Sequence, residues 1–150
     1  MLIYIGADHR GFQLKENLKE FLIRQGYEVI DAGNKVYDEN DDYPDFVITV
    51  AKAVSQDPAN RRGILICGSG VGVDVVANKF RGVRSALVGN SDQAYLSRNH
   101  NDANVLSLAS DFLDEEQAKK ILSTWLQTDF SNEPRHQRRL DKIRNIENNL

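Results

Sequence analysis

Short apolar runs alternate along the chain with longer amphipathic segments. Runs such as 2–6 and 63–66 have the length and β-branched content of strands buried in a sheet. Apolar residues that recur at helical spacing over 12–22, before Gly26, predict a helix instead. The whole pattern predicts strands at 2–6, 27–30, 63–66, 84–88 and 105–108, and helices at 12–22, 44–56, 73–79, 91–99, 114–127 and 134–148.

This alternation of strand and helix is typical of an α/β fold with a parallel sheet between two layers of helices. The chain has 150 residues, of which 41% are hydrophobic, and this suits one compact domain over 1–150. We therefore expect a three-layer α/β/α domain with a five-stranded parallel sheet and a charged C-terminal helix.

Charge and hydropathy argue against two classes of partner. The net charge of −3 provides no basic field for nucleic acid, and no apolar run approaches the roughly 20 residues that span a bilayer. The first residues lack the features of a signal peptide. Because the single cysteine, Cys67, cannot form an internal disulfide, we expect a cytoplasmic protein.

Ligands of open α/β sheets bind at the carboxyl ends of strands, near the point where the strand order reverses. We expect three polar clusters to lie there. Asp8 and His9 follow the first strand, a glycine-rich segment follows the third, and His100 with Asn101 comes just before the fifth.

The glycine-rich segment is the strongest candidate for chemistry. It begins with Cys67 and continues through Gly68, Ser69, Gly70, Val71 and Gly72. Its glycines allow several N–H groups to point at one spot beside a helix N-terminus, where negative charge is favoured. The same field favours a thiolate, which can act as a base or a nucleophile. The alternative for Cys67 is a small buried hydrophobic residue.

Known phosphate and metal motifs do not fit this segment. Its spacing is G-x-G-x-G, and no acidic residue that could hold a ribose follows the next strand, which disfavours a dinucleotide site. Val73 stands where a cysteine phosphatase has arginine, and the Gly-Lys-Ser/Thr ending of a Walker loop is missing. No H-E-x-x-H or C-x-x-C spacing occurs, so we expect neither a metal nor a cofactor.

Two arginines at the start of the last helix indicate an anionic ligand. Arg135 and Arg139 lie four residues apart on one face, after Ser131 or Asn132 as the helix cap. Both arginines oppose the helix dipole and repel each other, and a bound phosphate dianion would relieve both effects. The alternative is a solvated helix whose charge is balanced by acidic neighbours, Glu133 and Asp141.

Taken together, these segments resemble the type B ribose-5-phosphate isomerases in order over nearly the whole chain. The resemblance implies a Rossmann-like fold without a nucleotide, and a sugar phosphate that is isomerised without a metal. It also implies a homodimer or a dimer of dimers whose active sites are completed by two chains. The segments that carry it are Gly-Ala-Asp-His-Arg-Gly-Phe at 6–12, Asp-Tyr-Pro at 42–44, and the stretches 63–72, 77–80, 97–106 and 135–139.

Carried over residue by residue, the resemblance implies specific roles. Cys67 would move a proton between C1 and C2 of the sugar, and His100 would open the furanose ring. Asp8 would bind a substrate hydroxyl. The remaining assignments are the phosphate clamp, His9, Arg135 and Arg139, and the groups around the enediolate oxygens, Gly68, Ser69, Gly70, Val71, Gly72 and Asn101.

The resemblance leaves three functions open. One branch of the family has a glutamate at the position of Val71, which here leaves Cys67 as the base. The family also includes isomerases of six-carbon substrates, allose 6-phosphate and galactose 6-phosphate, so sugar length stays open. A sugar-phosphate binding module without catalysis is the third possibility.

Overall fold

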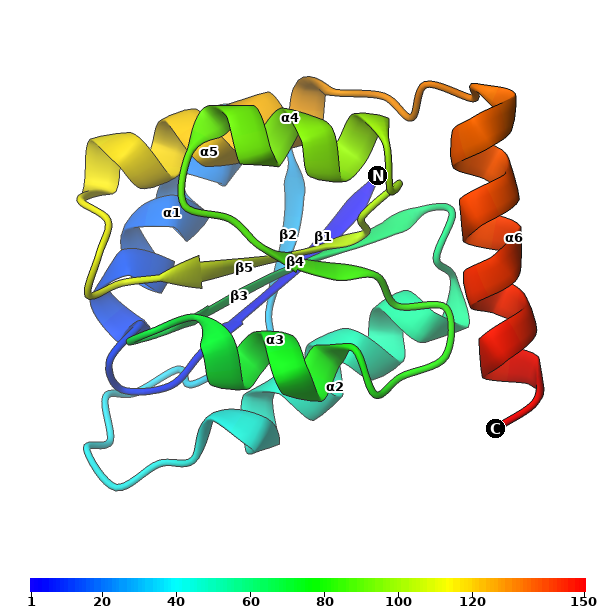
Figure 1. Ribbon diagram of the computed structural model, residues 1–150. Helices are drawn as coiled ribbons and strands as arrows, with labels where there is room; N and C mark the ends of the chain where they lie inside the picture. Colours follow the sequence, from blue (N-terminus) through cyan, green and yellow to red (C-terminus); the bar gives the residue numbers. More distant parts are fainter.

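The computed structural model describes residues 1–150, and its centre is a five-stranded sheet in which every strand is parallel (Figure 1). The strand order is β2-β1-β3-β5-β4. Residues 64–66 and 105–108 of the inner strands are fully or almost fully buried, as expected for strands covered on both sides. The strands are β1 (Leu2–Ala7), β2 (Glu28–Asp31), β3 (Arg61–Cys67), β4 (Ser85–Leu87) and β5 (Val105–Ala109).

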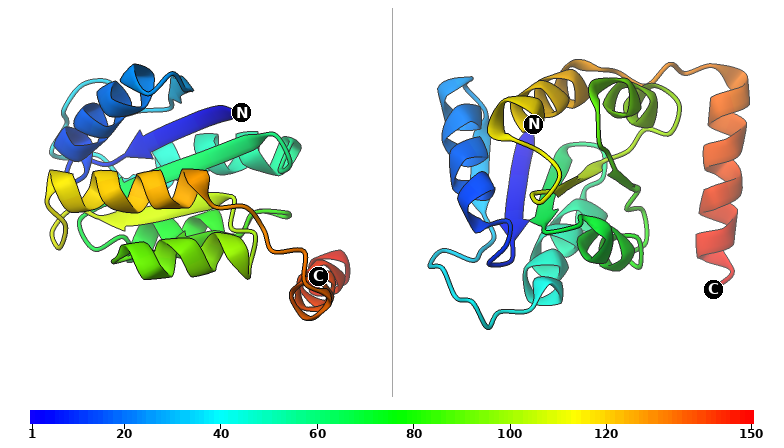
Figure 2. Two further views of the ribbon diagram at one scale, coloured as in Figure 1. Left: turned by 90° about the horizontal axis from the view of Figure 1, so that it is seen from above. Right: turned by 60° about the vertical axis from the view of Figure 1, so that its left-hand side comes forward.

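Helices cover both faces of the sheet, which confirms the predicted three-layer α/β/α fold (Figures 1 and 2). One layer contains α1 (Phe12–Arg24), α4 (Ser91–Asn99) and α5 (Glu115–Gln127), and the other contains α2 (Tyr43–Gln56) and α3 (Val71–Ala77). Alternate residues of β3 separate the two cores. Ile64 and Ile66 pack under the first layer, while Leu65 and Cys67 pack under the second.

The predicted elements all occur, with shifts at their ends. Helix α3 begins two residues earlier than predicted, because Gly70, at a φ of 73°, turns the chain directly into the helix. The predicted cap of α6 (Pro134–Asn148) is wrong. Its N-cap is Glu133, with no side-chain capping bond, and the Ser131 hydroxyl accepts a hydrogen bond from the Glu133 amide at 3.2 Å instead.

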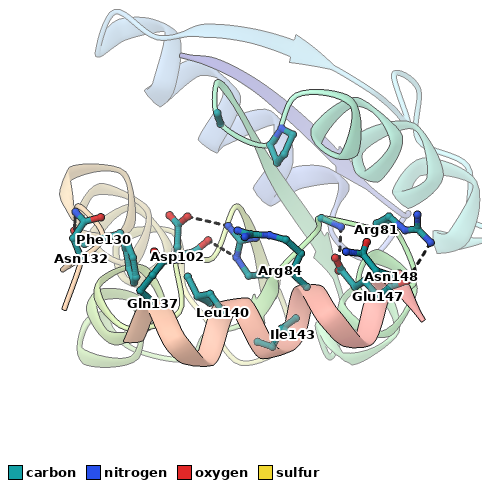
Figure 3. A pocket seen from close by; sticks show the side chains of 14 residues that line it. Arg81, Arg84, Asp102, Phe130, Asn132, Gln137, Leu140, Ile143, Glu147 and Asn148 are labelled. Carbon is teal, nitrogen blue, oxygen red and sulfur yellow. Dashed lines mark hydrogen bonds and ion pairs between the residues drawn. The ribbon is translucent and has the colours of Figure 1, made fainter. Parts of the chain in front are cut away.

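Helix α6 stands beside the sheet rather than on one of its faces, at the side opposite the carboxyl ends of the strands (Figure 1). Its buried residues are His136 and Leu140. A cavity of about 500 Å³ separates it from the body of the protein, with Arg84 and Asp102 on one wall and Gln137 and Leu140 on the other (Figure 3). None of the helices has the combination of length and apolar character that crossing a membrane requires.

Candidate active site

The reversal in strand order falls between β1 and β3, which are hydrogen-bonded neighbours. The chain passes from β1 to β2 on one side, whereas β5 and β4 lie beyond β3 on the other. The loops that follow β1 and β3 therefore meet at the carboxyl edge of the sheet. This brings Asp8 and His9 to the same place as the segment from Cys67 to Gly72, as predicted.

The glycine loop surrounds the Cys67 sulfur with backbone. The Gly70 amide donates to Cys67 Sγ at 3.2 Å, and only 5% of the Cys67 surface is exposed. Ser69 is exposed, and its hydroxyl accepts from the Val71 amide at 3.3 Å. The loop thus places a hydroxyl and backbone amides beside the buried sulfur.

Two glycines of the loop leave room for neighbours that the sequence did not indicate. A Cβ atom on Gly72 would lie 2.6 Å from the ring of Tyr43. A Cβ atom on Gly68 would lie 2.7 Å from Arg10 Nε and 2.9 Å from Asp111 Oδ2. Arg10 and Asp111 form an ion pair with each other. A side chain at either glycine would displace these partly exposed side chains, which lie against the glycine loop.

Asp8 is a buried carboxylate at the end of β1, with 6% of its surface exposed. Its Oδ1 accepts from the Arg10 amide at 3.0 Å and the Gly11 amide at 3.1 Å. Burial raises the pKa of Asp8, and these two hydrogen bonds only partly offset the effect. No protein hydrogen bond reaches its Oδ2, so this oxygen is available to a ligand hydroxyl.

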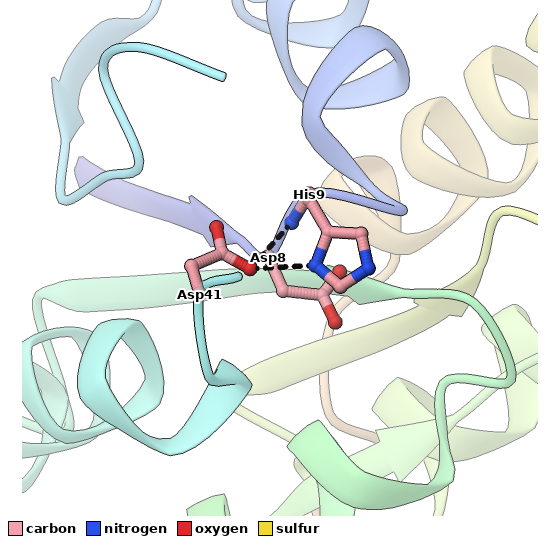
Figure 4. Close-up of side chains that lie close together, drawn as sticks. All are labelled: Asp8, His9 and Asp41. Atoms are coloured by element: carbon pink, nitrogen blue, oxygen red, sulfur yellow. Dashed lines mark hydrogen bonds and ion pairs between the residues drawn. The ribbon is translucent and has the colours of Figure 1, made fainter. Parts of the chain in front are cut away.

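His9 is held by Asp41, which the sequence analysis did not select (Figure 4). Asp41 Oδ1 accepts from His9 Nδ1 at 2.7 Å and from the His9 amide at 2.9 Å. The hydrogen bond to this carboxylate raises the pKa of His9 and favours an imidazolium, which suits an anionic ligand. Ligand atoms of Asp8, His9 and Asp41 lie within 4.8 Å of one another, a grouping that could also hold a cation.

His100 and Asn101 are not at this edge, and that part of the prediction is wrong. His100 is the C-cap of α4, before β5 begins, and the β5 strand runs parallel to β3. Residues that precede a parallel strand lie at the amino edge of the sheet, whereas Cys67 ends β3 at the carboxyl edge. Figure 1 shows the same separation, because the end of α4 lies near α6 and the arrowhead of β5 points away from it.

The turn that carries His100 and Asn101 is fixed by charged side chains. Asp102 has a φ of 46°, and its carboxylate accepts from Arg98 at 2.8 Å and from Arg84 at 2.9 Å. Arg84 Nε also donates to the Asn101 carbonyl at 3.1 Å. These contacts leave the Asn101 side chain exposed and without a protein partner.

Arg135 and Arg139 lie at the same amino edge as His100, on α6. Both are exposed. Arg135 Nε pairs with Glu133 at 3.0 Å, whereas Arg139 has no acidic partner. The sequence offered Asp141 as a balancing charge, but Asp141 interacts with Gln137 and Arg144 instead. One guanidinium is therefore free to bind an anion, and the other is held only by a surface ion pair.

The candidate residues thus form two groups, here called half-sites, at opposite edges of one sheet. One contains the thiol, Asp8 and a cationic imidazole, and the other contains His100, Asn101 and the arginines. Each half-site lacks groups that the other has. The half-site with Cys67 has no free pair of arginines, and the half-site with His100 has no thiol beside a glycine loop.

Known proteins resemble this chain in both sequence and fold. Residues 3–143 match the model of the ribose/galactose isomerase family. The chain is 45% identical to the probable ribose-5-phosphate isomerase B of Mycoplasma genitalium over 94% of this chain and 92% of that one. It is 43% identical to the ribose-5-phosphate isomerase B of Escherichia coli, over 97% and 95%.

A solved structure extends the likeness to three dimensions. The crystal structure of ribose-5-phosphate isomerase B from Mycoplasma genitalium with bound ribulose 5-phosphate matches with a TM-score of 0.97 and 44% identity. The match covers 99% of this chain and 97% of that one. The chain is therefore a member of the ribose/galactose isomerase family.

Proposed function

We propose that this protein interconverts ribose 5-phosphate and ribulose 5-phosphate. The observation that carries the proposal is the match, over nearly the whole chain, to a ribose-5-phosphate isomerase B whose crystal structure contains ribulose 5-phosphate. The residues at the carboxyl edge of the sheet support it, because an aldose–ketose isomerisation needs a base at carbon and donors near the oxygens that gain charge.

In the proposed reaction, Cys67 is the base. Its thiolate removes the proton from C2 of the open-chain aldose, and the electron pair forms the C1–C2 double bond of an enediolate. The thiol then returns the proton to C1 while a proton passes from O2 to O1, which gives the ketose with no change in overall composition. The Gly70 and Val71 amides already donate to Cys67 and Ser69, so the other amides of the glycine loop stabilise the charged oxygens, together with the Ser69 hydroxyl and Asn101.

The substrate enters largely as a closed furanose, so the ring must open first. In the proposed mechanism the His100 imidazole moves a proton from the O1 hydroxyl to the ring oxygen as the bond from C1 to that oxygen breaks. Asp8 holds a hydroxyl through its free carboxylate oxygen. The phosphate is bound by His9, which Asp41 keeps protonated, and by Arg135 and Arg139.

This assignment requires two chains for each site, because the residues are divided between opposite edges of one sheet. We propose a homodimer, or a dimer of such dimers, in which one protomer supplies Cys67 and His9 while its partner supplies the groups from the amino edge. A two-fold axis would create two identical sites of this kind. Because the mechanism needs Cys67 as a reduced thiol, we expect the enzyme in a reducing compartment such as the cytoplasm.

An isomerase assay on ribose 5-phosphate with a chelator present tests the reaction, the substrate and metal independence together. We expect full turnover with 5 mM EDTA as without it, on the order of the median enzyme rate of ~10 s⁻¹. Turnover that the chelator abolishes would instead assign the Asp8, His9 and Asp41 cluster to a metal. Allose 6-phosphate is the control substrate. A higher kcat/KM for it than for ribose 5-phosphate would show that the preferred substrate is a hexose phosphate.

A binding module would behave differently in the same experiment. It would bind ribulose 5-phosphate but would not exchange the sugar's C1 or C2 protons with deuterium from the solvent. Ligand binding without exchange in the wild-type protein would therefore contradict the proposed enzyme.

A further inference from the structure

His136 is the most buried polar residue of α6, with 2% of its surface exposed. Its ring lies against the ring of His100, with the centroids 4.3 Å apart and the planes tilted by 35°. On its other side, His136 Nδ1 is hydrogen-bonded to the Ser131 hydroxyl at 2.6 Å. A contact on one face and a hydrogen bond at one edge fix the orientation of the His136 ring.

The segment that carries Ser131 is itself attached to the end of α4. The Ser131 amide donates to the Asn99 carbonyl at 2.9 Å, one residue before His100. The contacts therefore form a closed loop. They run from the end of α4 through Ser131 to the His136 ring, and from there to the ring of His100 beside Asn99. Such a closed set of contacts restricts the rotamers available to His100 more than packing on one side would.

Electrostatics favour a neutral ring at this position. Burial lowers the pKa of His136, and the neighbouring His100 lowers it further. A neutral imidazole can pack against His100 without repelling the charge that His100 carries when it donates a proton. An arginine or lysine in the same place would oppose that charge.

We propose that His136 is a positioning residue for His100, acting through the ring contact and through its hydrogen bond with Ser131. This inference rests on the proposed function, since it concerns the ring-opening step that we assign to His100. His136 itself need not touch the sugar, because its ring already contacts His100 on one side and Ser131 on another. The expected effect of its loss is confined to steps that depend on the His100 orientation.

Two substitutions remove the same hydrogen bond from opposite ends. His136→Phe keeps a buried ring that anchors α6 and packs on His100, but it lacks the nitrogen that meets Ser131. Ser131→Ala removes the hydroxyl and keeps the histidine. We expect each variant to lower kcat on ribose 5-phosphate by about tenfold and to leave KM within about threefold, because α6 and its arginines stay in place.

The double variant distinguishes a shared interaction from two separate defects. If both residues act through one hydrogen bond, the double variant should be no worse than either single variant. Losses that multiply to about a hundredfold would overturn the proposal. Lys142→Ala, an exposed change on the same helix, is the matched control and should retain wild-type kcat.

Deuterium exchange at C1 of saturating ribulose 5-phosphate separates positioning of His100 from a general structural role. This exchange needs Cys67 but no ring opening, so we expect it to stay within about twofold of wild type in both single variants. Exchange that falls as far as kcat, or a kcat that does not fall, would overturn the inference. An inactive wild-type protein would instead contradict the proposed function, so the two failures are distinguishable.

Discussion

Cys67 and His100 lie at opposite edges of the same parallel sheet. Cys67 ends β3 in register with Ala109, and His100 precedes Val105, the first residue of β5. A parallel strand rises ~3.3 Å per residue, so the four steps from Val105 to Ala109 alone separate the two edges by about 13 Å. In the proposed mechanism Cys67 and His100 act on neighbouring atoms of one sugar. We therefore infer that the two residues at one site come from different chains.

The first prediction concerns complementation between inactive variants. Cys67→Ala and His100→Asn should each be inactive alone, because every site of either homodimer lacks one group. After subunits exchange in an equal mixture, about half of the dimers are mixed, and each has one intact site. Activity should therefore return to roughly a quarter of the wild-type value. The measurement is turnover before and after mild denaturation and refolding of the mixture.

Absence of any recovery, with mixed dimers demonstrated by native mass spectrometry, would refute shared sites. A mixture of Cys67→Ala with Cys67→Ser is the control. It should stay inactive, because no combination of those chains restores the base.

The second prediction isolates the thiol. General-base catalysis contributes about 10²–10⁴-fold to a rate, so Cys67→Ala should lower kcat by at least this factor. The affinity for inorganic phosphate should not change. We assign phosphate binding to His9, Arg135 and Arg139, and none of these side chains hydrogen-bonds to the sulfur. Isothermal titration with phosphate and the isomerase assay together check this. A variant with near-normal turnover would remove Cys67 from the mechanism.

Periodicity was sufficient to predict the fold because each buried element carries its own pattern. Helix α4 has the predicted bounds, 91–99, and its capping residue Asn90 accepts from the Gln93 amide at 2.9 Å. Helix α6 also begins and ends as predicted, since Pro134 suits a first turn. The half-site with Cys67 could also be predicted from the sequence, because the thiol and the glycine loop are adjacent along the chain.

Two contacts around the candidate site join residues far apart in the sequence, which no local pattern encodes. Asp41 meets His9 across 32 residues, and His136 meets His100 across 36, so neither partner has a signal in its own segment. The placement of His100 was wrong for a simpler reason. A residue just before a parallel strand belongs to the amino edge, and the prediction had grouped it with residues that follow strands.

The third prediction concerns the pH dependence of His9. The Asp41 carboxylate raises the pKa of His9 above its ordinary 6.5, so the imidazolium persists to a higher pH and is lost as pH rises through that raised value. Asp41→Asn removes the charge and should lower the pKa. We expect KM for ribose 5-phosphate to match wild type near pH 6 and to be several-fold higher near pH 8.

Titration of the His9 ring by NMR provides the direct measurement, and His9→Gln identifies its signal. Asp45→Asn, an exposed change on α2, is the control and should move neither the titration nor KM. The interpretation fails if Asp41→Asn leaves the His9 titration where it was, or if KM rises equally at pH 6 and pH 8.

The fourth prediction concerns a buried charge that stabilises the fold. Lys15 on α1 is fully buried, and its Nζ donates to both carboxylate oxygens of Asp31 at 2.9 and 2.8 Å. Burial opposes ionisation of Asp31, but hydrogen bonds from Lys15, Lys19 and the Gly33 amide outweigh it and hold its pKa below the ordinary 3.8. Asp31→Asn should lower the free energy of unfolding by about 3 kcal/mol at pH 7, because it leaves a buried ammonium with less compensation.

The same pKa fixes how this loss depends on pH. A carboxyl group whose pKa is depressed in the folded protein contributes stability above its unfolded value, and this contribution disappears as pH falls through the folded value. The difference between Asp31→Asn and wild type should therefore shrink below pH 3.8. Urea unfolding at pH 7 and pH 3, at one protein concentration, measures both values. The control is Glu20→Gln, which breaks the exposed ion pair with Arg24 and should change the free energy of unfolding by less than ~1 kcal/mol at either pH. If Glu20→Gln lost as much stability as Asp31→Asn, burial of Lys15 would not be the cause.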